Sequence, residues 1–243
     1  MNDTPTLRPG LPELPARLRS RPLDARGYPV PWFVQWFLPD GTPAEDGEGV
    51  PDFRVVDARK KVQAHNHARC WVCGQRLGSY LAFVVGPMCA VNRTSGEPPA
   101  HRECAVFSAI ACPFLTRPQA SRRESKIPEG AAAHPGGLRR NPGVALVWIT
   151  KSYRLILQGK HDYLVTMGDP LEILYFAEGR RARRSEVLES VESGLPLLME
   201  TAESESPAAV EALLRQVKQA SALWSENAAL WEPELVAAGE ATA

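Results

Sequence analysis

Two short residue pairs in the sequence have the composition and spacing of metal ligands. Cys70 and Cys73 form a CxxC pair that Gly74 follows, and His101 and Cys104 form an HxxC pair further along the chain. Thiolate sulfur and imidazole nitrogen are donors that tetrahedral Zn²⁺ prefers. A two-residue gap lets both cysteines of a tight turn face one ion, and residues three apart at a helix start share one face. The pattern therefore predicts one zinc ion per chain, bound by Cys70, Cys73, His101 and Cys104.

The same residues predict a structural zinc rather than a catalytic one. Four protein ligands complete the coordination shell and leave no position for a water molecule. Other interpretations stay open. A redox-active CxxC pair would leave the HxxC pair unexplained. Disulfide pairing would leave one of the five cysteines unpaired. Cys89 or Cys112 can replace one of the four ligands; otherwise both are expected to be small buried apolar residues.

A strand and a helix are expected to position these ligands. Residues 80–85 are aromatic and β-branched, which is typical of a strand, and the Gly-Pro pair at 86–87 ends it. A polar loop over 92–99 then leads to a helix from about 100 to 111. The amides at the N-terminus of such a helix stabilise thiolate charge, which suits the second ligand pair in its first turn.

The order of the ligands resembles that of treble-clef zinc fingers. In that class a CxxCG knuckle on a hairpin supplies two ligands, and the first turn of a following helix supplies the other two. The segment 70–104, with a hairpin-like stretch over 77–86 between the pairs, is similar to this order. Treble clefs serve nucleases, nucleic-acid-binding proteins and protein-interaction modules. The resemblance therefore implies a metal scaffold and no single activity.

Enzymatic activity is uncertain on these patterns. HNH nucleases share the treble-clef plan, and they need a histidine on the hairpin that activates water beside a divalent ion. Residues 74–100 contain no histidine and one acid, Glu97. The string His65-Asn66-His67 precedes the first ligand pair and is expected on an exposed helix end. An HxE pattern at 101–103 fits zinc deaminases poorly, because the CxxC pair comes before it.

The formal net charge of zero conceals a strong asymmetry. Residues 185–243 carry 11 Glu against Arg215 and Lys218, a net charge of −9, so residues 1–184 carry +9. A basic region of this size indicates a nucleic-acid or other acidic partner, unless the acidic end neutralises it within the molecule. The arginines at 180–184 can equally pair with the glutamates that follow them. Candidate nucleic-acid contacts are Arg93, the linker residues Arg117, Arg122, Arg123, Lys126, Arg139 and Arg140, and the cluster Arg180, Arg181, Arg183 and Arg184.

The element patterns indicate an α+β fold class. Strands are predicted over 32–37, 53–56, 144–149, 153–157, 163–167 and 172–177, with 153–157 and 163–167 able to pair with 144–149. Three helices are predicted, each with an N-cap residue before its first turn. They run to about 64 from the cap Asp57, to about 201 from the cap Ser185, and from 207 onward after the cap Ser206. Proline-rich and glycine-rich stretches divide the chain into a Pro-rich arm (1–27), a zinc-binding treble-clef-like domain (28–115), a basic linker (116–142) and a small α+β domain with acidic C-terminal helices (143–243).

The apolar runs of the sequence are short. None approaches the roughly 20 residues of a membrane span, and no apolar stretch of a secretory signal follows the first charged residues. We therefore expect a cytoplasmic protein with no membrane partner. The patterns together favour an intracellular zinc-binding module for nucleic acid or for a protein partner. An HNH-like metal-dependent nuclease and a purely structural assembly protein are the alternative functions.

Overall fold

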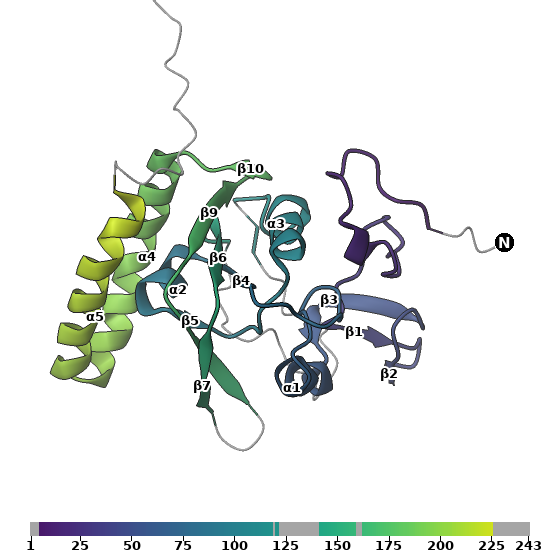
Figure 1. Ribbon diagram of the computed structural model, residues 1–243, viewed down its shortest axis with the longest axis horizontal. Coiled ribbons are helices and arrows are strands. Elements are labelled where there is room, and N and C mark those ends of the chain that lie inside the picture. Colours follow the sequence, from purple (N-terminus) through teal and green to yellow (C-terminus); the bar gives the residue numbers. More distant parts are fainter. Residues whose placement is uncertain (1–4, 119, 122–140, 159–161, 226–243) are drawn as a thin grey trace, which may run out of the picture.

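The computed structural model describes residues 5–118, 120–121, 141–158 and 162–225 of the 243-residue chain. Helices and antiparallel sheets occur together in it, which confirms the predicted α+β class. Figure 1 shows a central sheet with helices packed against each of its faces and a smaller sheet beside it. Among the described residues, no helix combines the length and the apolar character needed to cross a membrane.

The central sheet has four antiparallel strands in the order β10-β9-β6-β4. Its strands are β4 (Leu81–Val85), β6 (Ala145–Thr150), β9 (Glu172–Ala177) and β10 (Arg180–Arg181). Every residue of β6 is buried, as expected for a strand with both faces covered. Because side chains alternate along a strand, Leu146 and Trp148 enter one hydrophobic core while Val147 and Ile149 enter another.

The first face of the central sheet is covered by three helices and a second sheet with the strand order β5-β8-β7. These elements are α2 (Pro87–Asn92), β5 (Thr94–Ser95), β7 (Tyr153–Leu157), β8 (Tyr163–Met167), α4 (Arg184–Glu205), α5 (Pro207–Ala220) and η2 (Ser221–Trp224). Gly194 lies inside α4, where a Cβ atom would stand 2.8 Å from Met88 Cγ. The glycine therefore allows α2 to approach α4 closely.

The second face of the central sheet carries α3 (Arg102–Ala111), which contacts β4, β6 and β9. The N-terminal segment also packs there, through the short 3-10 helix η1 (Ala16–Leu18). Leu18 is only 2% exposed in this core. Residues 5–27 of the Pro-rich arm are largely irregular and pack on the second face through η1.

A third sheet, with the order β2-β1-β3, lies beside the second face. It comprises β1 (Val34–Phe37), β2 (Pro43–Ala44) and β3 (Val50–Val56), and α1 (Ala58–Asn66) follows it. Asp57 caps α1 by accepting a hydrogen bond from the Arg59 amide at 2.9 Å, which confirms the predicted cap. Trp71 stacks on Phe33 with ring centroids 4.9 Å apart and so joins the metal-binding segment to this sheet.

Four local predictions were wrong. Residues 77–86 supply β4, the strand predicted over 80–85, rather than a hairpin, and the polar loop expected over 92–99 contains the short strand β5. β7 and β8 pair with each other instead of with β6. The N-cap of α4 is Arg183 rather than Ser185, because the Glu186 carboxylate accepts a hydrogen bond from the Arg183 amide. In each case a partner distant in sequence or a competing cap determined the outcome.

The central sheet contains strands from both sides of the predicted linker. β4 precedes the linker, β6 follows it, and the two strands pair over their whole length from Leu81↔Thr150 to Val85↔Leu146. The described ends of the linker also meet, because the Asn141 amide donates to the Ala120 carbonyl oxygen at 2.8 Å. The division of the chain into domains stays a prediction from composition, and strands on both sides of the linker share one core.

Candidate metal centre

The CxxC pair lies on a tight turn, the knuckle, which we define as residues 69–76. Arg69 and Arg76 form an antiparallel bridge at its base, and the Cys70 amide donates to the Gln75 carbonyl oxygen at 2.7 Å. Gly74 has a φ of +77°, and a Cβ atom there would stand 2.7 Å from Cγ of Trp32. Only glycine accommodates both this left-handed backbone and the close approach of the indole.

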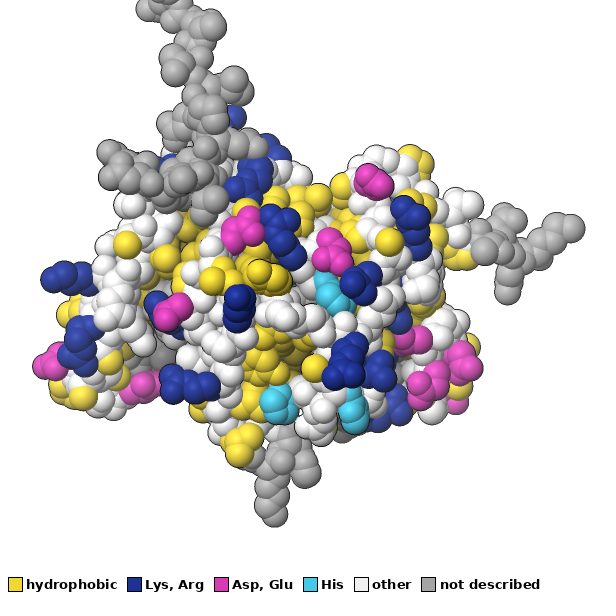
Figure 2. Space-filling view, viewed as in Figure 1, with side chains coloured by type: hydrophobic (Ala, Val, Ile, Leu, Met, Phe, Trp, Pro, Cys, Tyr) yellow, Lys and Arg dark blue, Asp and Glu magenta, His cyan; other side chains and the backbone are white. Residues whose placement is uncertain are grey.

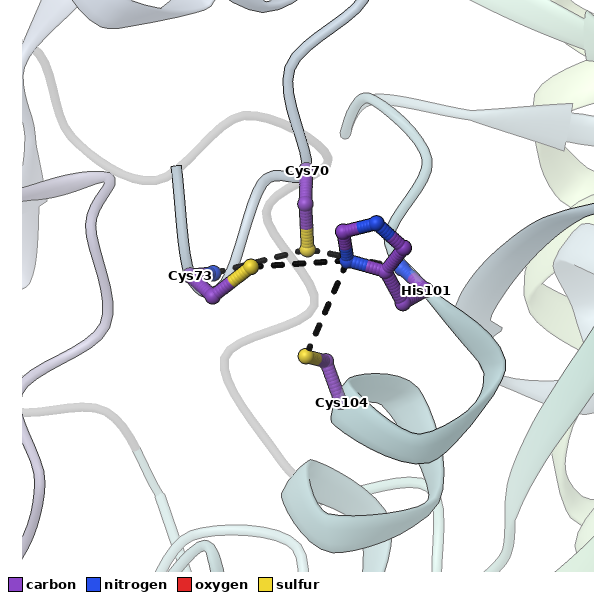
Figure 3. Close-up of side chains that lie close together, drawn as sticks. All are labelled: Cys70, Cys73, His101 and Cys104. Carbon is purple, nitrogen blue, oxygen red and sulfur yellow. Dashed lines mark hydrogen bonds between the residues drawn. The ribbon is translucent and has the colours of Figure 1, made fainter. Parts of the chain in front are cut away.

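The second ligand pair lies at the start of α3. The residue before it, Ala100, exchanges two backbone hydrogen bonds with Ala82 of β4, at 2.9 and 2.7 Å. His101 is the N-cap residue of α3 and Cys104 lies in the first helical turn, as the sequence predicted. The edge of the central sheet therefore fixes where α3 begins, and the helix then directs both side chains toward the knuckle (Figure 3).

The four predicted ligands converge on one point. Their ligand atoms all lie within 4.8 Å of one another, and all four residues are buried. The Nδ1 atom of His101 is 3.4 Å from Cys73 Sγ and 4.0 Å from Cys104 Sγ. Ligand atoms around a tetrahedral zinc ion stand about 3.5–3.8 Å apart, given Zn–S and Zn–N bonds of about 2.3 and 2.1 Å. We call Cys70, Cys73, His101 and Cys104 the Cys3His cluster.

Hydrogen bonds around the cluster orient its donors. Nε2 of His101 lies 3.0 Å from the Arg76 carbonyl oxygen, so this nitrogen carries the proton and Nδ1 is left to face the three sulfur atoms. The backbone amides of Cys73 and His101 each point to Cys70 Sγ at 3.4 Å. Amides directed at a sulfur atom stabilise a thiolate, which is the form that binds a metal.

The pKa shifts of the four side chains also suit a site that binds a cation. Burial opposes ionisation of Cys70, but hydrogen bonds from Cys104, Cys73 and His101 outweigh it and lower the pKa of the Cys70 thiol. Hydrogen bonds to Cys70 and Cys73, together with burial, raise the pKa of Cys104. Hydrogen bonds to the same two cysteines raise the pKa of His101 to about 10. A divalent cation can replace the protons that the four side chains share.

The N-terminal segment closes the outer side of the cluster. Nε of Arg17 donates to Glu103 Oε1 at 2.8 Å, and Nη1 of the same arginine donates to Gln75 Oε1 at 3.0 Å. These two bonds connect η1 to both the knuckle and α3. Sequence reasoning missed this contribution, since nothing in the first 27 residues resembles a metal-binding motif. The only local signal is the apolar series Leu11, Leu14 and Leu18, which packs in this core.

The predicted nucleic-acid contacts that the structure describes mostly lie against nearby acidic, aromatic or backbone groups. Arg93, at the C-terminus of α2, pairs with Asp169 at 2.5 Å. Arg180 pairs with Glu186 at 2.6 Å, so the cluster at 180–184 lies against the first turn of α4. Arg181 lies over the Phe176 ring, Arg183 is the cap residue of α4, and Arg184 donates to the Trp224 carbonyl oxygen. Arg117 is exposed, whereas Arg122, Arg123, Lys126, Arg139 and Arg140 lie outside the described residues.

The other described histidines and cysteines lie outside the Cys3His cluster. His65 and His67 are exposed at the C-terminal end of α1, and His65 Nδ1 is 3.0 Å from the Tyr153 hydroxyl. Cys89 and Cys112 are partly buried thiols, and burial raises the pKa of Cys89. Within the described part of the chain, the Cys3His cluster is the one group of three or more Cys, His, Asp or Glu residues placed to hold a metal ion.

No protein-family model matches the chain, and neither do any curated protein or any solved structure. The Cys3His cluster, a buried site that can hold a metal ion such as zinc, is therefore what identifies this protein functionally.

Proposed function

We propose that this protein is a structural-zinc protein that acts as a binding module for nucleic acid. The observation that carries the proposal is the convergence of three buried thiols and one oriented imidazole within 4.8 Å. This donor set suits Zn²⁺, and its four ligands complete a tetrahedral shell. The order of knuckle and helix start resembles that of a treble clef, although a single strand replaces the hairpin of that class.

The position of the cluster supports a structural role for the metal. It connects three segments that are separate in the sequence: the knuckle, the start of α3 and, through Arg17, the N-terminal segment. Because the unfolded chain holds no preformed site, metal binding contributes directly to the free energy of folding. The chemistry that zinc supplies here is cross-linking of the chain.

A nucleic-acid partner is favoured over an enzymatic function. The first 184 residues carry a net charge of +9, which attracts a polyanion. A nuclease would need a general base beside a metal ion with an open coordination position. His65 and His67, the residues of the tempting HNH-like string, lie on α1 outside the cluster, and His65 is held by Tyr153.

Metal content, measured by elemental mass spectrometry on the purified chain, tests the metal half of this proposal. We expect one zinc per chain in the unaltered protein and loss of zinc in Cys70→Ser and His101→Ala. The matched controls are Cys89→Ser and Cys112→Ser, which remove thiols outside the cluster and should keep the zinc. Zinc retained by both ligand variants would contradict the proposed centre.

Salt-dependent binding tests the nucleic-acid half. A protein that neutralises phosphates loses affinity steeply as the salt concentration rises, because binding releases counterions. We therefore expect the affinity for oligonucleotides to fall by at least tenfold between about 50 and 200 mM salt. A zinc-loaded protein with no oligonucleotide affinity at 50 mM salt would leave the structural metal in place and refute the nucleic-acid partner.

A further inference from the structure

One face of the molecule is built from segments that the metal centre and the central sheet bring together. Leu77 of the polypeptide after the knuckle donates its amide to the Ala68 carbonyl oxygen at 2.7 Å, which holds the knuckle against the end of α1. His65 on α1 contacts Tyr153 of β7, and Lys151, two residues earlier, lies 5.6 Å from the ring centroid of Tyr80. We call the surface formed by Arg69, Arg76, Tyr80 and Lys151 the knuckle face.

The two segments that form the knuckle face contain no acidic residues. Residues 58–96 include six Lys or Arg, two His and no Asp or Glu, and residues 130–161 also lack Asp and Glu. Four of these six, Arg59, Lys60, Lys61 and Arg93, pair with carboxylates of other segments. Among the described residues, no such pair offsets the charge of Arg69, Arg76 or Lys151. Figure 2 shows Lys or Arg side chains beside two histidines over α1 and the adjoining loop.

Two arginines of this face oppose each other without a carboxylate partner. Arg69 and Arg76 are directly across the antiparallel bridge of the knuckle, both are exposed, and no ion pair links either to an acid among the described residues. Like charges placed directly opposite each other destabilise a β-bridge. Arg69 Nη1 donates to the Gly74 carbonyl oxygen at 3.0 Å, which leaves its other guanidinium donors for an anion. An anionic partner would relieve this repulsion.

An exposed aromatic ring lies beside one cation of this face, Lys151. Tyr80 is 57% exposed, an unusual position for a large ring that lies directly before the buried strand β4. Lys151, opposite it in the register of β4 and β6, places its ammonium group over the ring. Cations beside an exposed aromatic ring form an arrangement on which unpaired nucleotide bases stack while phosphates contact the cations.

We propose that the knuckle face binds single-stranded nucleic acid, with phosphates on Arg69, Arg76 and Lys151 and a base stacked on Tyr80. This inference rests on the proposed function and assigns it a surface and a class of ligand. A single strand is favoured over a duplex, because the bases of a duplex are already stacked on one another and have no free face for Tyr80. The metal centre positions this surface, since His101 bonds the Arg76 carbonyl oxygen.

Fluorescence anisotropy with labelled 20-nucleotide single strands of DNA and RNA, and with the matching DNA duplex, tests the proposal. Arg69→Gln/Arg76→Gln removes two phosphate contacts and should flatten the slope of log affinity against log salt by about 1.4. Tyr80→Ala should weaken single-strand binding about tenfold, and Tyr80→Phe, which keeps the ring, should bind like the unaltered protein. Arg215→Gln/Lys218→Gln on α5 is the charge-matched control and should change neither quantity.

Zinc content measured on every variant separates the possible failures. Reduced single-strand binding at one zinc per chain supports the knuckle face, and Lys151→Gln/Tyr80→Ala provides the same test without altering the knuckle. Unchanged binding in these zinc-loaded variants, with the unaltered protein binding, would overturn the knuckle face but not the proposed function.

Tighter binding of the duplex than of the single strand would overturn the ligand class. Absence of binding by the unaltered, zinc-loaded protein would overturn both proposals. Similar affinity for DNA and RNA would show that the 2′-hydroxyl is not read.

Discussion

The two faces of the central sheet are stabilised by different means. On the face under α2, α4 and α5, the core contains large side chains such as Phe83, Trp148 and Tyr175, each at most 1% exposed. On the face under α3, more than half of the buried core residues are alanine or cysteine. Burial of apolar area contributes roughly 25 cal/mol per Å², so small side chains provide less stabilisation for each residue buried.

This difference explains where the metal site lies. A core of small residues brings backbones close together but supplies little hydrophobic free energy, and short segments such as the knuckle contribute few contacts of their own. A metal ion bound by the Cys3His cluster would compensate for this deficit on the second face. The first face needs no such cross-link, because two helices of 22 and 14 residues bury their apolar stripes there.

Metal removal should have the largest effect and should distinguish the two faces. With zinc chelated, we expect amide hydrogens of the knuckle and of the first turns of α3 to exchange at least a hundredfold faster, because the protonated ligands no longer hold these segments together. Amides of β9 and α4 should keep most of their protection. Hydrogen exchange followed by mass spectrometry measures both regions at once. Equal loss of protection on both faces would show that the metal stabilises the whole molecule rather than one face.

Truncation of two neighbouring residues on β6 should show which of the two cores contributes more to the free energy of unfolding. Trp148→Ala removes a fully buried indole and its hydrogen bond to the Gly168 carbonyl oxygen, and we expect a loss of about 3–5 kcal/mol in the free energy of unfolding. Val147→Ala, on the face of α3, should cost only about 2 kcal/mol. Urea denaturation of the zinc-loaded protein gives both values. A larger cost for Val147→Ala would reverse the proposed ranking.

A single methyl group should disturb the knuckle. Gly74→Ala forces an L-residue to a φ of +77° and places its Cβ atom 2.7 Å from the Trp32 indole, so we expect about 2 kcal/mol of destabilisation and weaker zinc retention in a chelator titration. Gly78→Ala, two residues beyond the knuckle, meets no atom within 4 Å and provides the matched control. A comparable loss of zinc in both variants would indicate that the strain at Gly74 is unimportant.

The smallest expected effect concerns pH. The hydrogen bond from Arg102 on α3 lowers the pKa of the Glu172 carboxyl on β9 below its ordinary value of 4.5. A lowered carboxyl pKa adds stability that is complete above pH 4.5 and is lost as the pH falls further through the folded-state pKa. Because Arg102 is half exposed, we expect the contribution to be below about 1 kcal/mol. Glu172→Gln should therefore weaken the acid dependence of the melting temperature slightly; an unchanged acid dependence would show that the pair contributes nothing.

Local sequence patterns were sufficient for the chemistry of the metal centre. Residues three apart have fixed relative positions on a tight turn and at a helix start, so the spacing of the CxxC and HxxC pairs already indicates which atoms converge. The Asp57 and Ser206 caps are local for the same reason, and both occur in the structure. The α+β class follows from the succession of strand and helix patterns.

The tertiary structure decided what no local pattern encodes. β4 pairs with β6 across more than 60 residues, the N-terminal segment docks through Arg17 and Leu18, and the knuckle face assembles from two separate acid-free stretches. Strand pairing and docking depend on complementary surfaces that are far apart in the sequence, so many partners fit any one strand equally well until the chain folds. The sequence by itself therefore determined the candidate metal ligands, whereas only the tertiary structure decided what those ligands hold together and which surface they present.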